Sequence, residues 1–147
     1  ARERYEELST VPGQIDVDLF LGVVDRAEGH TVAAARHLLA ALNAPGEHWI
    51  AEGDYYIMQV AASVIDDAIT AATLVGAASA AYERSSTEQP AFIVTDLRNV
   101  TESLRARLGA DEFERRTRTG GGRTYDEAVA MAREALDALA AQGGTGS

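Results

Sequence analysis

An uncharged, alanine-rich run at residues 68–82 limits what this chain can fold into more than any other feature. It reads AITAATLVGAASAAY and lies between Asp67 and Glu83. If the run is a helix, every face of that helix can be buried, because no face carries a charge. Small side chains, with Gly76 in the middle, let neighbouring helices approach closely. We predict that it is the central helix of an all-α domain. Taken alone, this composition describes a buried helix and names no activity.

Length, charge and the lack of cysteine bound the kinds of site that the chain can carry. Its 147 residues are enough for one domain with its own core. Without cysteine there are no disulfides, thiolate metal ligands or cysteine nucleophiles. A formal net charge of −10 disfavours a surface for nucleic acid or anionic membranes. The longest uncharged run is too short to span a bilayer, and no signal peptide is recognisable. We expect a soluble, cytoplasmic protein that contacts neither nucleic acid nor membrane directly.

Both ends of the chain differ from its middle. The sequence begins with Ala1 and a charged ARERYEEL segment, which suggests a piece of a longer polypeptide. All 13 basic side chains are arginine, which together with the abundance of alanine is typical of a high-GC bacterial gene. We predict that residues 1–14 are a linker or lead-in and that residues 15–141 form the helical domain. The glycine-rich residues 142–147 are predicted to be a disordered tail.

The first half of the chain predicts a helical hairpin. Apolar residues from Phe20 to Ala27 follow helical spacing, and Gly29 suits a left-handed cap at the end of that helix. Thr31 is expected to be the N-cap of the next helix, which stops before Pro45.

A second hairpin repeats the first at an offset of 37 residues, close to the ~34-residue tetratricopeptide period. Its first helix is expected to begin near Trp49 or Glu52, and Asp66 or Asp67 to cap the central helix. Short hairpins at a near-constant offset favour a tetratricopeptide-like array of antiparallel helical hairpins over a closed four-helix bundle.

The next segment predicts a cover for this array. Pro90 suits the first turn of a helix, and the apolar residues from Ile93 to Leu108 recur at three and four positions. We expect this amphipathic helix to lie as a lid over the central helix.

The C-terminal segment predicts a cap for the array. A short helical turn at residues 111–117 is expected to bury Phe113 and to be broken by the glycine run at residues 119–122. Thr124 and Glu127 have the spacing of a capping box, in which each side chain accepts from the other residue's amide. The last helix follows with an apolar inward face, and we expect it to pack on the array as a C-terminal capping helix.

No set of residues in the sequence indicates catalysis. A Gly-x-Ser-x-Gly elbow and the Gly-Lys-Ser/Thr ending of a nucleotide-binding loop are both missing. The histidines are His30, His37 and His48, and no carboxylate stands three or four positions from the first two, as a helical metal site needs. Asp66 and Asp67 are explained by the dipole of a helix N-terminus. We therefore predict no catalytic residue, no metal site and no cofactor.

Two groups of side chains are candidates for binding a partner or effector. The first surrounds the glycine run, where free amides and arginine side chains favour an anion or a partner's carboxylates; a solvated loop is the alternative. The second lies at the start of the third helix, because the first helix of each hairpin lines the concave face of a helical array; core packing is the alternative. The residues are Arg115, Arg116, Arg118 and Arg123 in the first group and Tyr55, Tyr56 and Gln59 in the second.

The C-terminal half of the chain carries a recognisable pattern of motifs. They are Leu74-Val75-Gly76-Ala77-Ala78, a helix ending in Leu108-Gly109, Phe113 followed by Gly120, and Thr124-Tyr125-Asp126-Glu127-Ala128-Val129. This pattern resembles the C-terminal region of bacterial, chiefly actinobacterial, LuxR-type and MalT-like transcription regulators and related signal-transduction ATPases. The resemblance covers residues 66–139. It departs from the family at Thr117, where tryptophan is usual, and at Asp66, where glycine is usual.

The resemblance implies a tetratricopeptide-like sensor or interaction module, with a nucleotide-binding domain and often a DNA-binding helix-turn-helix elsewhere in the polypeptide. We expect a non-catalytic domain of a multidomain transcription regulator that contacts a protein partner or the upstream domains of the same polypeptide. A homo-oligomer is compatible with the sequence. Two alternatives stay open: a small-molecule sensor with a pocket near Tyr55 and Tyr56, and a purely structural capping domain.

Overall fold

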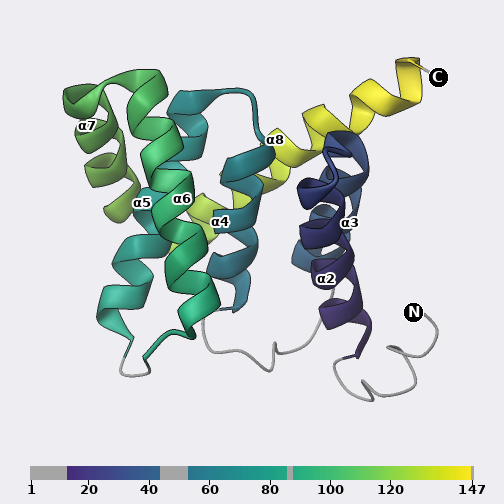
Figure 1. Ribbon diagram of the computed structural model, residues 1–147, viewed down its shortest axis with the longest axis horizontal. Coiled ribbons are helices and arrows are strands. Elements are labelled where there is room, and N and C mark those ends of the chain that lie inside the picture. The colour runs from purple at the N-terminus through teal and green to yellow at the C-terminus, as the bar shows by residue number, and fades with distance from the viewer. Residues whose placement is uncertain (1–12, 44–52, 86–87, 147) are drawn as a thin grey trace.

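The computed structural model describes residues 13–43, 53–85 and 88–146, and within these ranges every regular element is a helix (Figure 1). The prediction of an all-α fold is confirmed for this part of the chain. No helix in these ranges combines the length and apolar character that a membrane crossing requires. In chain order the helices are α2 (Gly13–Ala27), α3 (Thr31–Asn43), α4 (Gly53–Val64), α5 (Ala68–Arg84), α6 (Ala91–Leu108), α7 (Ala110–Gly121) and α8 (Tyr125–Gly146).

The first hairpin consists of α2 and α3, joined by a turn at Gly29. Gly29 has a φ of 81°, which confirms the predicted left-handed cap. Thr31 was expected to be the N-cap of α3, and this is wrong, because Thr31 is already the first helical residue. The helical hydrogen bonds of α3 already begin at His30, directly after the turn at Gly29, because the amide of Ala34 donates to the carbonyl of His30 at 2.9 Å.

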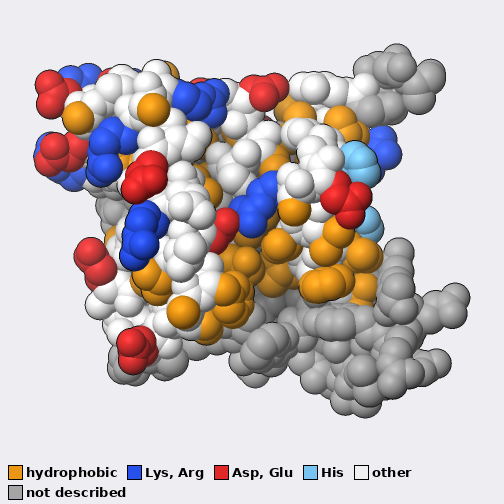
Figure 2. Space-filling model, in the orientation of Figure 1, with side chains coloured by type: hydrophobic (Ala, Val, Ile, Leu, Met, Phe, Trp, Pro, Cys, Tyr) orange, Lys and Arg blue, Asp and Glu red, His pale blue; other side chains and the backbone are white. Residues whose placement is uncertain are grey.

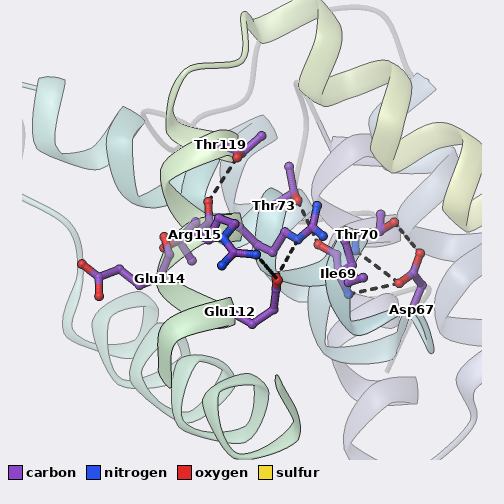
Figure 3. A network of polar contacts seen from close by, with 10 residues as sticks. Asp67, Ile69, Thr70, Thr73, Glu112, Glu114, Arg115 and Thr119 are labelled. Carbon is purple, nitrogen blue, oxygen red and sulfur yellow. Dashed lines mark hydrogen bonds and ion pairs between the residues drawn. The ribbon is translucent and has the colours of Figure 1, made fainter. Parts of the chain in front are cut away.

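The second hairpin consists of α4 and α5, and Asp67 rather than Asp66 caps α5. The Asp67 carboxylate accepts from the amides of Ile69 (3.0 Å) and Thr70 (3.4 Å) and from the Thr70 hydroxyl (2.7 Å) (Figure 3). The starts of α3 and α5, at Thr31 and Ala68, lie 37 residues apart, as the repeat offset predicts. Trp49 lies outside the described residues.

Helix α5 is buried on all sides through its middle, as its uncharged sequence predicts. Every residue from Ala71 to Ala78 is buried. Its most extensive neighbour is α7, although the helix at residues 91–108 was expected to cover it. A Cβ added at Gly76 would lie 2.0 Å from the carbonyl oxygen of Thr117, and one added at Gly120 would lie 1.8 Å from that of Thr73. The two backbones therefore touch, and Gly76 is a point of closest approach, as predicted.

The glycine run does not break the helix that precedes it, which corrects the prediction of a short turn ending near Thr117. Helix α7 continues through Gly120 to Gly121. Each glycine in a helix interior costs up to ~1 kcal/mol relative to alanine. Contact with α5 offsets this cost, because α7 can lie this close to α5 only where it has no Cβ at residue 120.

Helices α6 and α8 present the apolar faces that the sequence predicts. The capping box is confirmed, because the Glu127 amide donates to the Thr124 hydroxyl (3.1 Å) and the Thr124 amide donates to the Glu127 carboxylate (2.8 Å).

Helix α8 packs chiefly on α3 and also touches α4 and α5, so it crosses from one hairpin to the other (Figure 1). It runs to Gly146, past residue 141, where the helical domain was expected to end. The buried apolar residues of the two helices are Ile93, Val100 and Leu104 in α6 and Ala128, Val129, Ala132, Leu136 and Leu139 in α8.

Candidate functional site

A groove of about 530 Å³ lies where α2, α4 and α6 meet. Each of these helices is the first of a pair that is consecutive in the chain. Apolar side chains gather on this face between α6 and α2, beneath a basic and an acidic side chain (Figure 2). The groove residues that matter below are Val23 and Arg26 of α2, Tyr56 of α4, and Phe92, Thr95 and Asp96 of α6.

Arg26 and Asp96 form an ion pair in the wall of the groove. The two guanidinium nitrogens lie 2.9 and 3.3 Å from the two carboxylate oxygens. The side chains are only 21% and 18% exposed, so the pair is partly shielded from water. Arg26 also donates to the hydroxyl of Ser63 at 3.1 Å, which ties α2 to the end of α4 as well as to α6. The charges of this wall therefore neutralise each other.

Gln59 lies behind this ion pair and is completely buried. Its amide nitrogen donates to the Asp96 carboxylate (2.8 Å) and to the carbonyl of Ile93 (3.2 Å). Its amide oxygen accepts from the hydroxyl of Tyr82 at 2.9 Å. Gln59 was predicted to meet a ligand, and the structure instead places it beneath the groove, where it holds Asp96 and joins α4, α5 and α6. A buried amide with both its donor hydrogens and its acceptor engaged fixes the positions of its partners.

The adjacent residues Tyr55 and Tyr56 point to different parts of the molecule. Tyr56 lines the groove and packs edge-on against Phe92, with ring centroids 5.7 Å apart. Burial and the nearby Asp96 raise the pKa of its hydroxyl, while Arg26 opposes them. Tyr55 packs instead against Tyr125 of α8, at 5.8 Å. Of the two predicted tyrosines, only Tyr56 belongs to the groove.

Tyr125 ties the start of α8 to the start of α4. Its hydroxyl donates to the carboxylate of Asp54. Burial, followed by this hydrogen bond and the charge of Asp54, raises the pKa of Tyr125 well above its usual value. Tyr55 and Tyr125 therefore belong to the packing of α8 rather than to a ligand site.

Exposed apolar side chains flank the groove. Phe92 is 53% exposed although it lines the groove, and Phe20, one turn of α2 before Val23, is 51% exposed. Aromatic side chains that border a groove are common at the centres of protein interfaces.

The four predicted arginines are placed on or just after α7, away from the groove. Arg115 pairs with the Glu112 carboxylate at 3.1 Å (Figure 3). Arg116 pairs with the same carboxylate at 3.4 Å. Arg118 pairs in the same way with a glutamate of its own helix. Arg123 lies beyond the end of α7 and is exposed. The positive charges of α7 are thus offset within the helix.

The amides at the end of α7, on which the predicted anion site partly depends, are not free. The amides of Gly122 and Arg123 donate to the carbonyls of Thr119 (3.2 Å) and Gly120 (3.0 Å), because they close the end of α7. The exposed arginine side chains can still contact a partner, but the amides of Gly122 and Arg123 cannot.

His37 contacts carboxylates that the spacing along its own helix could not reveal. Its two ring nitrogens lie 3.5 Å from Asp18 and 3.5 Å from Asp25, both on α2. His30 lies 3.8 Å from Asp25. Within the described ranges no group of three or more such side chains is placed to hold a metal ion. His48 lies outside these ranges.

Sequence reasoning missed Arg26, Asp96 and Phe92, and one signal could have found Asp96. It stands three residues after Ile93 and four before Val100, on the stripe of α6 that is otherwise apolar. A carboxylate on such a stripe needs partners when the helix packs. Its partners come from α2 and α4, which no local pattern indicates.

No protein-family model, curated protein or solved structure matches this chain.

Proposed function

We propose that this chain is a non-catalytic interaction domain of a multidomain bacterial transcription regulator, and that it mediates protein–protein or interdomain regulatory contacts through the groove of α2, α4 and α6. The observation that carries the proposal is the groove itself. In it the exposed Phe92 packs edge-on against Tyr56, and both lie beside the ion pair of Arg26 and Asp96.

A tetratricopeptide-like arrangement would explain why the groove lies there. In such arrays the first helix of each hairpin lines a concave surface that binds extended or helical segments. Helices α2, α4 and α6 occupy that position in three successive pairs, and α3 and α5 begin one repeat offset apart.

The chemistry of the groove favours an apolar segment of a partner. Arg26 and Asp96 neutralise each other, so the groove offers little net charge to steer a charged ligand. Val23, Tyr56 and Phe92 are the large apolar residues of its lining. Aromatic side chains of this kind form the buried centres of protein interfaces. The partner is therefore a protein segment that inserts an apolar side chain against Phe92.

The contact of α5 with α7 offers a physical reason for the motifs that resemble LuxR-type regulators. The motif around Gly76 lies on α5, and the motif that ends in Gly120 lies on α7. Each glycine lies against the backbone of the other helix, so the two motifs together specify one helix pair. This supports a shared arrangement of helices.

A photoreactive amino acid in place of Thr95 tests the proposal, because Thr95 lines the groove and is exposed. In cells that express the full-length protein, illumination is expected to yield a crosslink to a partner or to another domain of the same polypeptide. Glu102 is the matched control, since it is exposed on α6 but lies outside the groove. Absence of a crosslink from position 95, or the same products from position 102, would contradict the proposal.

A small-molecule sensor is the second candidate, and the combination of Tyr56 with the partly shielded Arg26–Asp96 ion pair in one groove favours it. A groove of about 530 Å³ is large enough for a metabolite. A ligand at a hundred times its dissociation constant would stabilise the fold by ~2.7 kcal/mol, which a thermal-shift screen detects. Flat results across metabolites, together with a crosslink from position 95, would favour the protein partner.

A further inference from the structure

A second cleft, of about 360 Å³, lies between the α4–α5 connection and α8. It shares no residue with the groove of α2, α4 and α6. In Figure 1 it corresponds to the place where α8 passes the start of α5 on its way to α3. Its walls are Ile65 and Asp66 on one side and Met131, Glu134 and Leu139 on the other.

The rim of this cleft is acidic. Asp66 and Glu134 are exposed, and their side chains have no hydrogen-bond or ion-pair partner among the described residues. Asp67 stands beside them as the cap of α5, and the hydrogen bond from Thr70 lowers its pKa, so it is ionised at neutral pH. No basic residue is among the described residues that line the cleft.

Arg107 and Arg133 hydrogen-bond groups other than the rim carboxylates, although the charge of Arg107 also lowers the pKa of Asp67. Arg107 donates to the backbone carbonyl of Asp66 at 2.6 Å rather than to its carboxylate. Arg133, next to Glu134 in the chain, donates to Asn43 of α3 at 2.6 Å. Asp96 and Glu112, by contrast, are each paired with arginine. The unpaired carboxylates of this cleft are therefore complementary to a cation supplied from outside.

The floor of the cleft is apolar, which decides what kind of cation fits. Ile65 and Leu139 are each 6% exposed, and Met131 packs beside them. A hydrated metal ion gains nothing from such a floor, and within the described ranges no side-chain group is placed to bind one. The side chain of arginine or lysine has both parts, an aliphatic stem that covers apolar surface and a charged head that stays at the rim.

We propose that this cleft binds a basic, amphipathic segment of a partner protein, which lays an apolar side chain against Ile65 and Leu139 and places an arginine or lysine between Asp66 and Glu134. The interaction is independent of the groove. The two surfaces differ in chemistry, because one is neutral and aromatic and the other is acidic with an aliphatic floor.

A phage-displayed library of random 12-residue peptides, selected on the 147-residue chain, tests this inference. The enriched peptides are expected to carry arginine or lysine next to leucine, isoleucine or phenylalanine. Binding of the synthetic, fluorescently labelled peptides to the double variant Asp66→Asn/Glu134→Gln should be about three- to tenfold weaker than to wild type, since two exposed ion pairs are lost. Binding to wild type should also fall as the salt concentration rises.

The Phe92→Ala variant is the matched control, because it alters the groove and leaves the cleft intact. Peptides that bind the cleft should bind this variant as tightly as wild type. Peptides weakened only by Phe92→Ala would support the proposed function of the groove and overturn the inference about the cleft. Enrichment of peptides without basic residues, equal binding to the double variant, or no enrichment would overturn it as well. Displacement of the peptides by spermidine at equal concentration would assign the cleft to a small organic cation instead.

Discussion

The contact of α5 with α7 and the junction of α2, α4 and α6 hold helices together by opposite means. Between α5 and α7, Gly76 and Gly120 let the two backbones touch, so the contact depends on missing side-chain atoms. At the junction, Gln59 and Asp96 join the helices through hydrogen bonds between particular atoms. The first contact leaves no space for a ligand, whereas the second borders a groove of about 530 Å³. The contact between the two backbones therefore supports the fold alone, whereas the polar contacts that join α2, α4 and α6 also border the candidate site.

The largest effect is expected from Gly120→Ala, which breaks the backbone contact. Alanine normally stabilises a helix interior relative to glycine. Here its Cβ would lie 1.8 Å from the carbonyl oxygen of Thr73, so α5 and α7 would have to separate. We expect the free energy of unfolding to fall by about 4 kcal/mol or more, measured by urea denaturation followed by circular dichroism.

The neighbouring Gly121→Ala variant is the control for this prediction. Its Cβ would lie 3.6 Å from the Cβ of Ala80, an ordinary contact. Its stability should therefore be unchanged or slightly raised. Equal losses in the two variants would show that the close approach of Gly120 is unimportant.

Leu136→Ala measures the contribution of ordinary apolar packing, and its effect on stability should lie between those of Gly120→Ala and Gly121→Ala. Leu136 is completely buried on α8. Truncation should cost about 3 kcal/mol through lost burial and the cavity left behind. Asp137→Ala, at an exposed position of the same helix, should change stability by less than about 0.5 kcal/mol in the same denaturation experiment. A negligible loss for Leu136→Ala would argue against a capping role for α8.

Gln59→Leu tests whether the junction depends on particular atoms. The substitution removes the donor to Asp96 and the acceptor for Tyr82, and we expect a loss of about 2 kcal/mol. A double-mutant cycle with Tyr82→Phe should give a coupling energy of at least about 0.5 kcal/mol. Additive effects of the two substitutions would mean that the hydrogen bond between them contributes nothing.

The smallest effect is expected from Asp67→Ala, which removes the cap of α5. Loss of an N-cap side chain costs about 1 kcal/mol. The hydrogen bond from Thr70 lowers the pKa of Asp67, so the folded state favours the carboxylate. This contribution is present above the pKa of the unfolded chain, near 3.8, and is lost as the pH falls through the lower pKa of the folded state. The difference in stability between wild type and Asp67→Ala should therefore be present at pH 6 and shrink as the pH falls through the folded-state pKa. A difference that stays constant with pH would show that ionisation of Asp67 contributes nothing to the cap.

Most helices could be predicted because their signals are local. The capping box of Thr124 and Glu127, the positive φ of Gly29 and the apolar stripe of α6 depend on residues within a few positions of one another. The extent of α7 could not be predicted in this way. Glycine is unfavourable in an isolated helix, and only the contact with α5 makes it suitable at Gly120.

The candidate site could be predicted only in part. Placing candidates at the start of the third helix identified Tyr56, but the same reasoning included Tyr55, which faces α8, and Gln59, which lies beneath the groove. Which way each of three neighbouring side chains points depends on what packs against the helix, and a helical period alone does not show this.

The sequence by itself determined that the described part of the chain is helical and where most of its helices begin, because both follow from caps and periodicity. It also determined that the uncharged run of α5 would be buried, because burying a charge is costly. Only the tertiary structure decided that α7 rather than α6 lies closest to α5, that Arg26 meets Asp96 over 70 residues of chain, and that two clefts of different charge open on the surface. The physical reason is that these features depend on contacts between helices that are distant in sequence, and such contacts leave no pattern within any single helix.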